Sequence, residues 1–218
     1  MSASYRVLLA GGDHTHQEQY ARHFIEDGRC LPVAVTDAPG VDTRRQQLNA
    51  ALAHRFGVPY LPFHEAMELQ FEIASVCVAM ERRADVVEKL AAKGAHLYLD
   101  KPLAPSLRDA RSIASAVLRN GVIAQIFSQT TSSWGAGLRS WVHQNASSSA
   151  ASLHARMLVA KGTPGGFDSA LRVERSQIGP IPDEPAKREL FDLGFYPVSL
   201  LTWASGDLIS HVTAHTAY

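Results

Sequence analysis

The sequence lacks the features that mark several large classes of protein. Its 218 residues include only two cysteines, Cys30 and Cys77, which lie too far apart for a zinc knuckle or a redox pair. A disulfide scaffold is therefore excluded, and a reducing compartment is expected. No run approaches the roughly 18 consecutive apolar residues of a membrane span, and the N-terminus lacks a signal-peptide pattern. The 21 basic and 21 acidic residues balance, so the basic surface of a nucleic-acid-binding protein is missing. We expect a soluble, cytoplasmic protein that binds neither nucleic acid nor membrane.

Common catalytic motifs are also absent. No G-x-x-x-x-G-K-[ST] loop and no G-x-S-x-G elbow occurs, which argues against a P-loop nucleotidase and an α/β-hydrolase. His14 and His16 could contribute two metal ligands, but no neighbouring cysteine or carboxylate cluster completes a site. We therefore predict no metal centre.

Apolar segments alternate with helical patterns through residue 128. The apolar segments are continuous rather than alternating with polar residues, which is typical of parallel strands buried on both faces. The sequence therefore predicts an α/β fold whose first domain, residues 1–128, is a doubly wound sheet of the Rossmann type. The expected strands are 7–10, 32–36, 73–78, 96–99 and 122–128, and the expected helices are 17–26, 43–56, 84–92 and 107–119. Ser106 with Asp109 resembles a capping box at the start of the last helix, and Asn120-Gly121 ends it. Apolar spacing predicts one buried face on each of two helices: Leu48, Ala51, Leu52 and Phe56 on 43–56, and Leu107, Ala110, Ile113, Ala114, Val117 and Leu118 on 107–119.

Residues 129–218 follow a different pattern. The expected helices are 137–143 and 189–203, the expected strands are 151–160 and 208–216, and glycine and proline make 161–185 irregular. This order predicts an incomplete α+β domain with an open sheet.

The turn after the first strand is the first candidate binding element. It reads Gly11-Gly12-Asp13-His14, and glycines there allow a sharp bend and a close approach of the backbone to a pyrophosphate. The G-x-G-x-x-G spacing is not met, so an ordinary strand-to-helix turn is the alternative. Asp37, about 20 residues further on at the end of the next strand, strengthens the nucleotide interpretation because an acid there can bind both ribose hydroxyls. A helix cap or turn residue is the alternative role of Asp37.

A second candidate, Asp100-Lys101-Pro102, directly follows the fourth predicted strand. The carboxyl ends of parallel strands are where open α/β sheets bind ligands. Pro102 also restricts the backbone of Lys101 to extended geometry. A solvated charged pair at a strand end is the alternative.

A third candidate lies in the second domain. Asp192 and Tyr196 are four residues apart, so they share a face if the segment is helical, and Gly194 leaves space beside them. The alternative is an amphipathic helix with a surface aspartate and a packed tyrosine.

Together these segments resemble the glucose-fructose oxidoreductase/inositol dehydrogenase/MocA (Gfo/Idh/MocA) family of NAD(P)-dependent oxidoreductases, from Tyr5 to about Trp203. The segment 99–104 is similar to the family's Glu-Lys-Pro motif, with Asp100 in place of glutamate. The segment 192–197 is similar to the family's Asp-x-Gly-x-His helix start, with Tyr196 in place of histidine, as in some sugar-oxidising branches.

The chain departs from the family pattern in four places. The glycine fingerprint is altered, and Val78-Ala79-Met80 replaces a Thr-Pro-Asn turn. Lys187-Arg188 stands where paired glycines are usual, and the chain ends at Tyr218 although family members are much longer.

The resemblance implies hydride transfer between nicotinamide and a hydroxyl or carbonyl of a sugar, cyclitol or related polyol. Lys101 would contact the substrate hydroxyl and the cofactor, Tyr196 would exchange the proton, and Asp192 would orient the hydroxyl or Lys101. An unperturbed phenol titrates near pH 10. A neighbouring ammonium favours phenolate and brings that pKa closer to working pH.

The cofactor implied is NAD, because a carboxylate at Asp37 would repel the 2′-phosphate of NADP. Arg44 and Arg45 leave NADP open. The cofactor-binding residues expected are Gly11, Gly12, Asp13, His14, Asp37, Val78, Asp100, Lys101 and Pro102.

The resemblance also gives residues 129–218 the role of a partial substrate and oligomerisation domain. An unfinished sheet has unpaired edges and an exposed apolar face. We therefore expect a homo-oligomer formed through the C-terminal sheet, in a truncated or naturally shortened family member. The alternatives are a non-catalytic dinucleotide or sugar sensor of the same fold, a truncated inactive fragment, and a purely structural α/β module.

Overall fold

A computed structural model describes residues 4–11, 16–128, 130, 132–145, 154, 194–206, 209–211 and 213. These residues fall into two compact units. The first unit ends at Phe127 and the second begins at Ser128.

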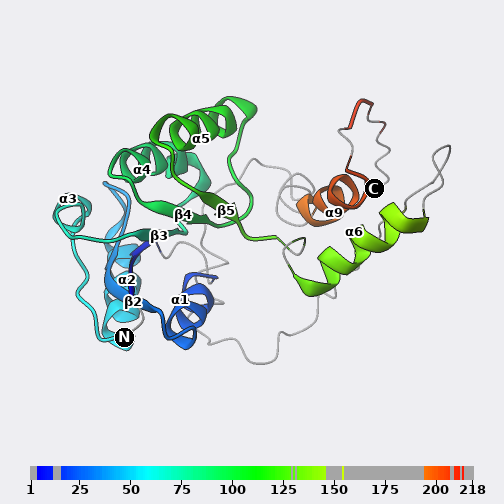
Figure 1. Cartoon of the computed structure of the whole chain (residues 1–218). Coiled ribbons are helices and arrows are strands. Elements are labelled where there is room, and N and C mark those ends of the chain that lie inside the picture. Colours follow the sequence, from blue (N-terminus) through cyan, green and yellow to red (C-terminus); the bar gives the residue numbers. More distant parts are fainter. Residues whose placement is uncertain are drawn as a thin grey trace. The chain divides into compact units, whose positions relative to one another are not determined.

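The first unit is built on a five-stranded sheet in the order β2-β1-β3-β4-β5, in which every neighbouring pair is parallel (Figure 1). The chain passes from β1 to β2 on one side and returns to β3 on the other, so the sheet has a topological switch point beside β1. The predicted Rossmann-type doubly wound sheet is confirmed. The strands are β1 (Tyr5–Ala10), β2 (Cys30–Thr36), β3 (Ile73–Val76), β4 (His96–Leu99) and β5 (Ala124–Ile126).

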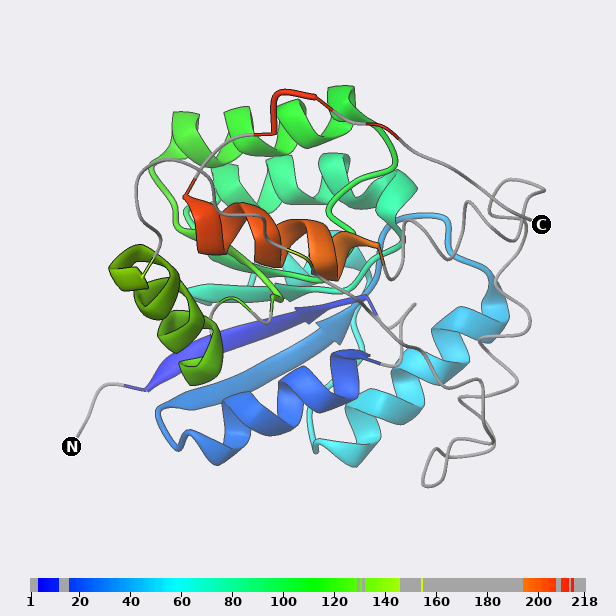
Figure 2. The same ribbon diagram turned by 90° about the vertical axis from the view of Figure 1, so that its right-hand side faces the viewer.

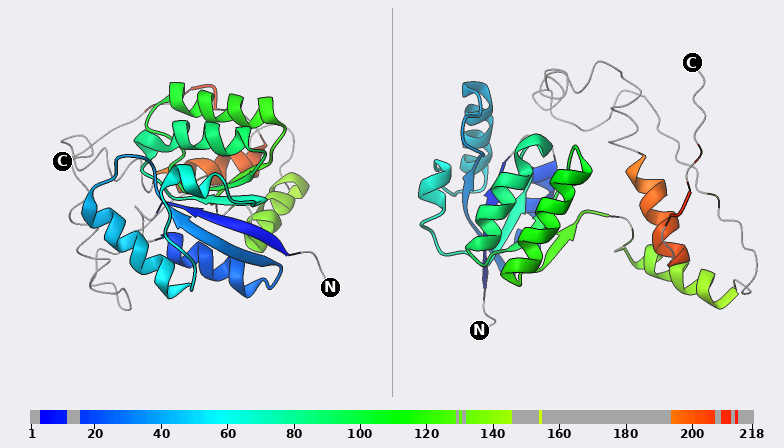
Figure 3. Two further views of the ribbon diagram at one scale, coloured as in Figure 1. Left: turned by 90° about the vertical axis from the view of Figure 1, so that its left-hand side faces the viewer. Right: turned by 90° about the horizontal axis from the view of Figure 1, so that it is seen from above.

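Helices cover both faces of this sheet (Figures 2 and 3). Val7 and Leu9 of β1 pack in the core under α1 and α2, whereas Leu8 and Ala10 pack in the core under α4 and α5. All four side chains are fully buried, which is why β1 is a continuous apolar run. The helices are α1 (His16–Glu26), α2 (Thr43–Arg55), α3 (Phe63–Ala66), α4 (Met80–Ala92) and α5 (Leu107–Asn120).

The ends of α5 match the sequence pattern, but its buried face does not. Ser106 caps the helix by accepting a hydrogen bond from the amide of Asp109, and Gly121 ends it with a φ of +64°. Leu107 and Leu118, which the apolar periodicity placed on the buried face, are 65% and 81% exposed. The buried stripe, which includes Ile113 and Ala116, is narrower than predicted, because α5 packs mainly against α4.

In the second unit, helix α6 (Ser133–Asn145) packs against helix α9 (Phe195–Ser205). The guanidinium carbon of Arg139 lies 4.3 Å from the ring centre of Trp203. The expected strand 151–160, apart from His154, and the irregular stretch 161–185 lie outside the described residues. The described residues within 208–216 form neither strand nor helix. In the described part of the chain, every helix is too short or too polar to cross a membrane.

Candidate functional site

Gly11 brings the turns after three strands together at the carboxyl edge of the sheet. Its amide donates to the carbonyl of Thr36 at 2.8 Å. Its φ is +82°, and a Cβ placed on it would lie 2.5 Å from the amide nitrogen of Val78. Only glycine allows the two backbones to approach this closely. The predicted cofactor residues Gly11 and Val78 are therefore neighbours, whereas Gly12, Asp13 and His14 lie outside the described residues.

The carboxylate of Asp37 is held rigidly at the end of β2. Its Oδ1 accepts from the amide of Ala38 at 2.8 Å, and its Oδ2 accepts from the side-chain amide of Asn49 on α2. Asp37 and Asn49 are 4% and 1% exposed. Asp37 also lines a cavity of about 360 Å³, whose other walls come from the turn 38–41, the segment 60–64 and Lys89. The cavity gives a ligand room beside a fixed carboxylate.

Asn49 was not found from the sequence, although a signal exists. The apolar periodicity of the second helix placed Ala51 on the buried face, but Ala51 is exposed and Asn49 and Ala53 are buried. Asn49 and Ala53 are four residues apart and therefore share one face. A polar residue four positions from an alanine on the same helix face is the pattern that points to a buried partner for Asp37.

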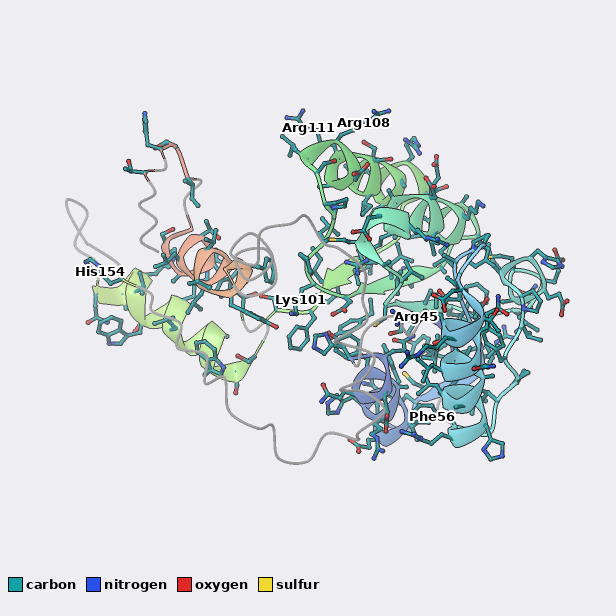
Figure 4. The ribbon with its side chains drawn as sticks, turned by 180° about the vertical axis from the view of Figure 1, so that it is seen from behind. Arg45, Phe56, Lys101, Arg108, Arg111 and His154 are labelled. Carbon is teal, nitrogen blue, oxygen red and sulfur yellow. The ribbon has the colours of Figure 1, made fainter. Side chains whose placement is uncertain are left out.

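Asp100 and Lys101 are buried rather than solvated. Asp100 is fully buried and Lys101 is 4% exposed, so the alternative of a solvated pair is wrong. The Oδ1 atom of Asp100 accepts from the amide of Lys101 at 2.9 Å and from the phenol of Tyr20 at 2.8 Å. His16 Nδ1 lies 3.0 Å from the same oxygen. Helix α1 therefore helps to fix the backbone that carries Lys101, which lies two residues after the end of β4 and is labelled in Figure 4.

Two phenols near Asp100 keep their protons at neutral pH. Burial, reinforced by the carboxylate of Asp100, raises the pKa of Tyr20 far above its ordinary value. Burial likewise raises the pKa of Tyr98 to about 12. The two rings meet edge to face with their centres 5.0 Å apart. Tyr20 donates a hydrogen bond to Asp100 and both rings pack together, so neither phenol is suited to exchange protons with a substrate.

Arg83 is a fully buried cation at the same edge, and sequence reasoning missed it. Its Nη1 atom donates to the carbonyl oxygens of Asp100 at 2.7 Å, Pro102, and Leu103 at 3.3 Å. Its Nη2 atom donates to the carbonyl of Val78 at 2.9 Å. Burial lowers the pKa of this guanidinium, and the charge of Asp100 opposes that shift. One side chain thus binds the segments that follow β3 and β4.

A signal for Arg83 was present in the pattern of the fourth predicted element. The helix was expected to begin at residue 84, but α4 begins at Met80. Arg83 lies three, four and seven residues before the buried Val86, Val87 and Leu90. Extending the helix by one turn would have placed an arginine on its buried face.

The other predicted site residues, Pro102, Asp192 and Tyr196, do not all lie in the first unit. The Lys101–Pro102 peptide bond is cis, and Pro102 is partly buried. Asp192 lies outside the described residues. Tyr196 lies in the first turn of α9, in the second unit, with its ring edge-on to Phe195 at 5.7 Å. The first unit therefore brings together Gly11, Val78 and the segment 100–102, while Tyr196 belongs to the other unit.

The carboxyl edge of the sheet fits a dinucleotide. The backbone turn at Gly11, the oriented carboxylate of Asp37 and Lys101 follow three different strands at the same edge, which is where open α/β sheets bind ligands. In the described part of the chain, no three histidine, cysteine, aspartate or glutamate side chains are placed to hold a metal ion.

Comparison with known proteins agrees with this geometry. A sequence model of the Gfo/Idh/MocA family, described as an oxidoreductase family with an NAD-binding Rossmann fold, matches residues 5–128. No curated protein sequence is significantly similar to the chain.

Several solved structures share the fold. An oxidoreductase from Agrobacterium radiobacter, in complex with NAD+, L-tartaric acid and magnesium, is 15% identical with a TM-score of 0.66, over 94% of this chain and 56% of that one. GenD2 from gentamicin A biosynthesis, in complex with NAD, is 18% identical with a TM-score of 0.65, over 94% of this chain and 55% of that one. The WlbA dehydrogenase from Bordetella pertussis, in complex with NADH and UDP-GlcNAcA, is 16% identical with a TM-score of 0.55, over 65% of this chain and 42% of that one.

At these identities the likeness to solved proteins is one of fold. The chain spans 56%, 55% and 42% of the length of these three solved proteins. The family match, in contrast, extends over more than half of this chain. The chain therefore belongs to the Gfo/Idh/MocA oxidoreductase family, and the parallel sheet of its first unit is that family's NAD-binding Rossmann fold.

Proposed function

We propose that the chain is an NAD(P)-dependent dehydrogenase or reductase that acts on a sugar, cyclitol or related polyol. The observation that carries the proposal is the placement of Lys101, nearly buried and held at the carboxyl edge of the sheet beside the Gly11–Val78 contact. A cation there can meet both a substrate hydroxyl and a cofactor bound along the same edge. The nucleotide sugar bound to the WlbA dehydrogenase supports this substrate class.

In the proposed mechanism, Lys101 binds the reacting hydroxyl of the substrate and Tyr196 takes its proton. When bound, nicotinamide supplies the hydride acceptor at its C4 atom. With the cofactor bound, Tyr196 would hold the proton that leaves the hydroxyl oxygen on oxidation of the alcohol and would return it on reduction of the carbonyl. The ammonium of Lys101 favours the phenolate of Tyr196, and Asp192 orients the hydroxyl or Lys101.

We propose that the cofactor lies against Gly11, Gly12, Asp13, His14, Asp37, Val78, Asp100, Lys101 and Pro102. Within this set, Asp100 acts from the interior, because its carboxylate is fully buried and bonded to the amide of Lys101. Asp37 faces the adenosine ribose, and its two oxygens are already oriented by Ala38 and Asn49.

We propose NAD as the preferred cofactor, because the fixed carboxylate of Asp37 would repel a 2′-phosphate. Arg44 and Arg45 on α2, the second of which is labelled in Figure 4, are the cations that could offset this repulsion. Asp37→Asn should lower the ratio of NADPH to NADH dissociation constants by about tenfold, or about 1.4 kcal/mol. A ratio unchanged by this substitution would show that Asp37 does not select the cofactor.

We propose that residues 129–218 form a partial substrate and oligomerisation domain, through which the protein forms a homo-oligomer. Helix α9 is apolar around most of its circumference, and such a helix needs cover on every side. Several of its large side chains and those of α6 are instead substantially exposed. These residues are Trp134, Trp141, Val198 and Trp203.

The proposed activity is tested by turnover of the full chain. NAD+ reduction is followed with inositols, free sugars and nucleotide sugars as substrates. Tyr196→Phe should lower kcat by about 10²–10⁴-fold, as expected for loss of a general base, and leave NADH affinity unchanged. Tyr5→Phe, at the amino end of β1 and 48% exposed, is the matched control.

Each other outcome has a defined meaning. Equal losses of kcat and cofactor affinity would remove the proposed role of Tyr196. NADH binding without turnover on any polyol would favour the non-catalytic sensor.

A further inference from the structure

Four backbone carbonyl groups converge on one point where β3 and β4 end. Carbonyl groups beyond the last rung of a strand pair have no partner in the sheet, yet a buried carbonyl needs a donor. The carbonyls of Val78, Asp100, Pro102 and Leu103 all accept from the guanidinium of Arg83.

Placing a charged guanidinium at this buried position costs desolvation free energy. Arg83 is fully buried, and burial penalises its charge. Among the described residues it makes no ion pair within 4.0 Å, and its Nε atom has no hydrogen-bond partner. A buried charge with no described carboxylate within 4.0 Å is weak evidence for a contribution to stability, so the geometry that it imposes is the property to explain.

Arg83 sets the spacing between two predicted cofactor contacts, the Val78 turn and Lys101. Val78 follows β3 and touches the backbone of Gly11, whereas Asp100 and Pro102 flank Lys101 after β4. A planar guanidinium presents its donors in a rigid fork. Because one fork reaches both segments, it fixes how far the Val78 turn lies from Lys101.

The opposite side of Lys101 is held from α1. The carboxylate of Asp100 accepts from the amide of Lys101 and from the phenol of Tyr20. The backbone of Lys101 is thus clamped between a carboxylate on the α1 side and a guanidinium on the α4 side. Such a clamp fixes the backbone position from which the Lys101 side chain extends.

We propose that Arg83 is a positioning residue, which holds Lys101 and the Val78 turn at the spacing that cofactor and substrate require. The inference rests on the proposed function, since it takes Lys101 as a residue that contacts cofactor and substrate. Lysine is a poor substitute, because all of its donors leave one nitrogen and cannot span both segments. A neutral side chain of similar length leaves all four carbonyls without this donor.

The test compares Arg83→Met with Leu90→Ala in the full chain without cofactor. Leu90 is also fully buried and lies on the same helix, two turns further on. Hydrogen exchange is measured at the amides of Asp100 and Lys101, which donate to the Val76 carbonyl and to the Asp100 carboxylate. At matched global stability, Arg83→Met should speed their exchange by about tenfold or more, and Leu90→Ala by less than about twofold.

A second measurement links the clamp to the ligand. Arg83→Met should raise the Kd for NADH by about tenfold, and Leu90→Ala should leave it within about twofold. If Arg83→Met fails to fold, Arg83→Lys takes its place, with the same direction and a smaller effect. Ethylguanidinium added to Arg83→Gly should restore both the slow amide exchange at Asp100 and Lys101 and the affinity for NADH.

The outcomes separate this inference from the proposed function. Equal exchange at Asp100 and Lys101 in the Arg83 and Leu90 variants would overturn the positioning role. If exchange is faster in the Arg83 variant but the wild-type chain binds no NADH, the positioning role of Arg83 is supported and the proposed cofactor is refuted.

Discussion

Replacing Gly11 with alanine tests how closely the turns after β1 and β3 approach each other. The added Cβ would lie 2.5 Å from the nitrogen of Val78, 2.7 Å from its Cα and 2.8 Å from the carbonyl carbon of Cys77. All three are backbone atoms at the end of a buried strand, so no flexible side chain can move aside. The φ of +82° adds a conformational penalty.

The two costs can be assigned separately. An alanine in the left-handed region costs about 1–2 kcal/mol, and overpacking against rigid atoms costs about 1–3 kcal/mol. Their sum is about 2–5 kcal/mol. For a protein of this size each kcal/mol lowers Tm by about 2–4 °C, so we expect Gly11→Ala to unfold about 10 °C below wild type.

Gly94→Ala is the matched control, because Gly94 has a φ of +88° and an added Cβ would meet nothing within 4 Å. It carries the conformational cost without the clash, and should lower Tm by about 2–8 °C. The assay is thermal unfolding followed by far-UV circular dichroism at one scan rate. Equal Tm values for the two variants would refute the close contact between Gly11 and Val78.

Two further predictions concern hydrogen bonds of the first unit. Tyr20→Phe removes a donor from the buried Asp100 carboxylate and should destabilise the protein by about 1–3 kcal/mol, seen as a lower urea midpoint at unchanged m-value; an unchanged midpoint would contradict the bond. The guanidinium of Arg6 lowers the pKa of Glu72 below its ordinary 4.5, so this pair stabilises the fold above that value and the contribution is lost as pH falls through the lower, folded pKa. Glu72→Gln should therefore make the free energy of unfolding fall less steeply below pH 4.5. The change should be small, because both side chains are 42% exposed. Parallel plots of unfolding free energy against pH for the variant and the wild type would contradict this prediction.

The parallel sheet could be predicted from the sequence because burial on both faces makes each strand continuously apolar. Val7 to Ala10 carries no polar residue, and neither does His96 to Leu99 after its first position. Strand lengths were less predictable. The last strand was expected over residues 122–128 but β5 spans Ala124–Ile126, since pairing with only β4 limits its ladder.

The site was predictable only in part, because sequence patterns treat polar residues in helices as solvent-facing. Arg83 and Asn49 are both buried, and each serves a partner in another element. The bond from Tyr20 to Asp100 joins residues 80 positions apart. The bond forms because β1 and β4 lie on either side of β3 in the sheet. Local sequence periodicity carries no information on this strand order.

The most direct test of the proposed function is a titration of the purified full chain with NADH and NADPH, followed by cofactor fluorescence. We predict that NADH binds in the micromolar range and more tightly than NADPH, with Asp37→Asn narrowing the difference. Binding of neither cofactor would contradict the central claim that the carboxyl edge around Gly11, Asp37 and Lys101 holds a dinucleotide.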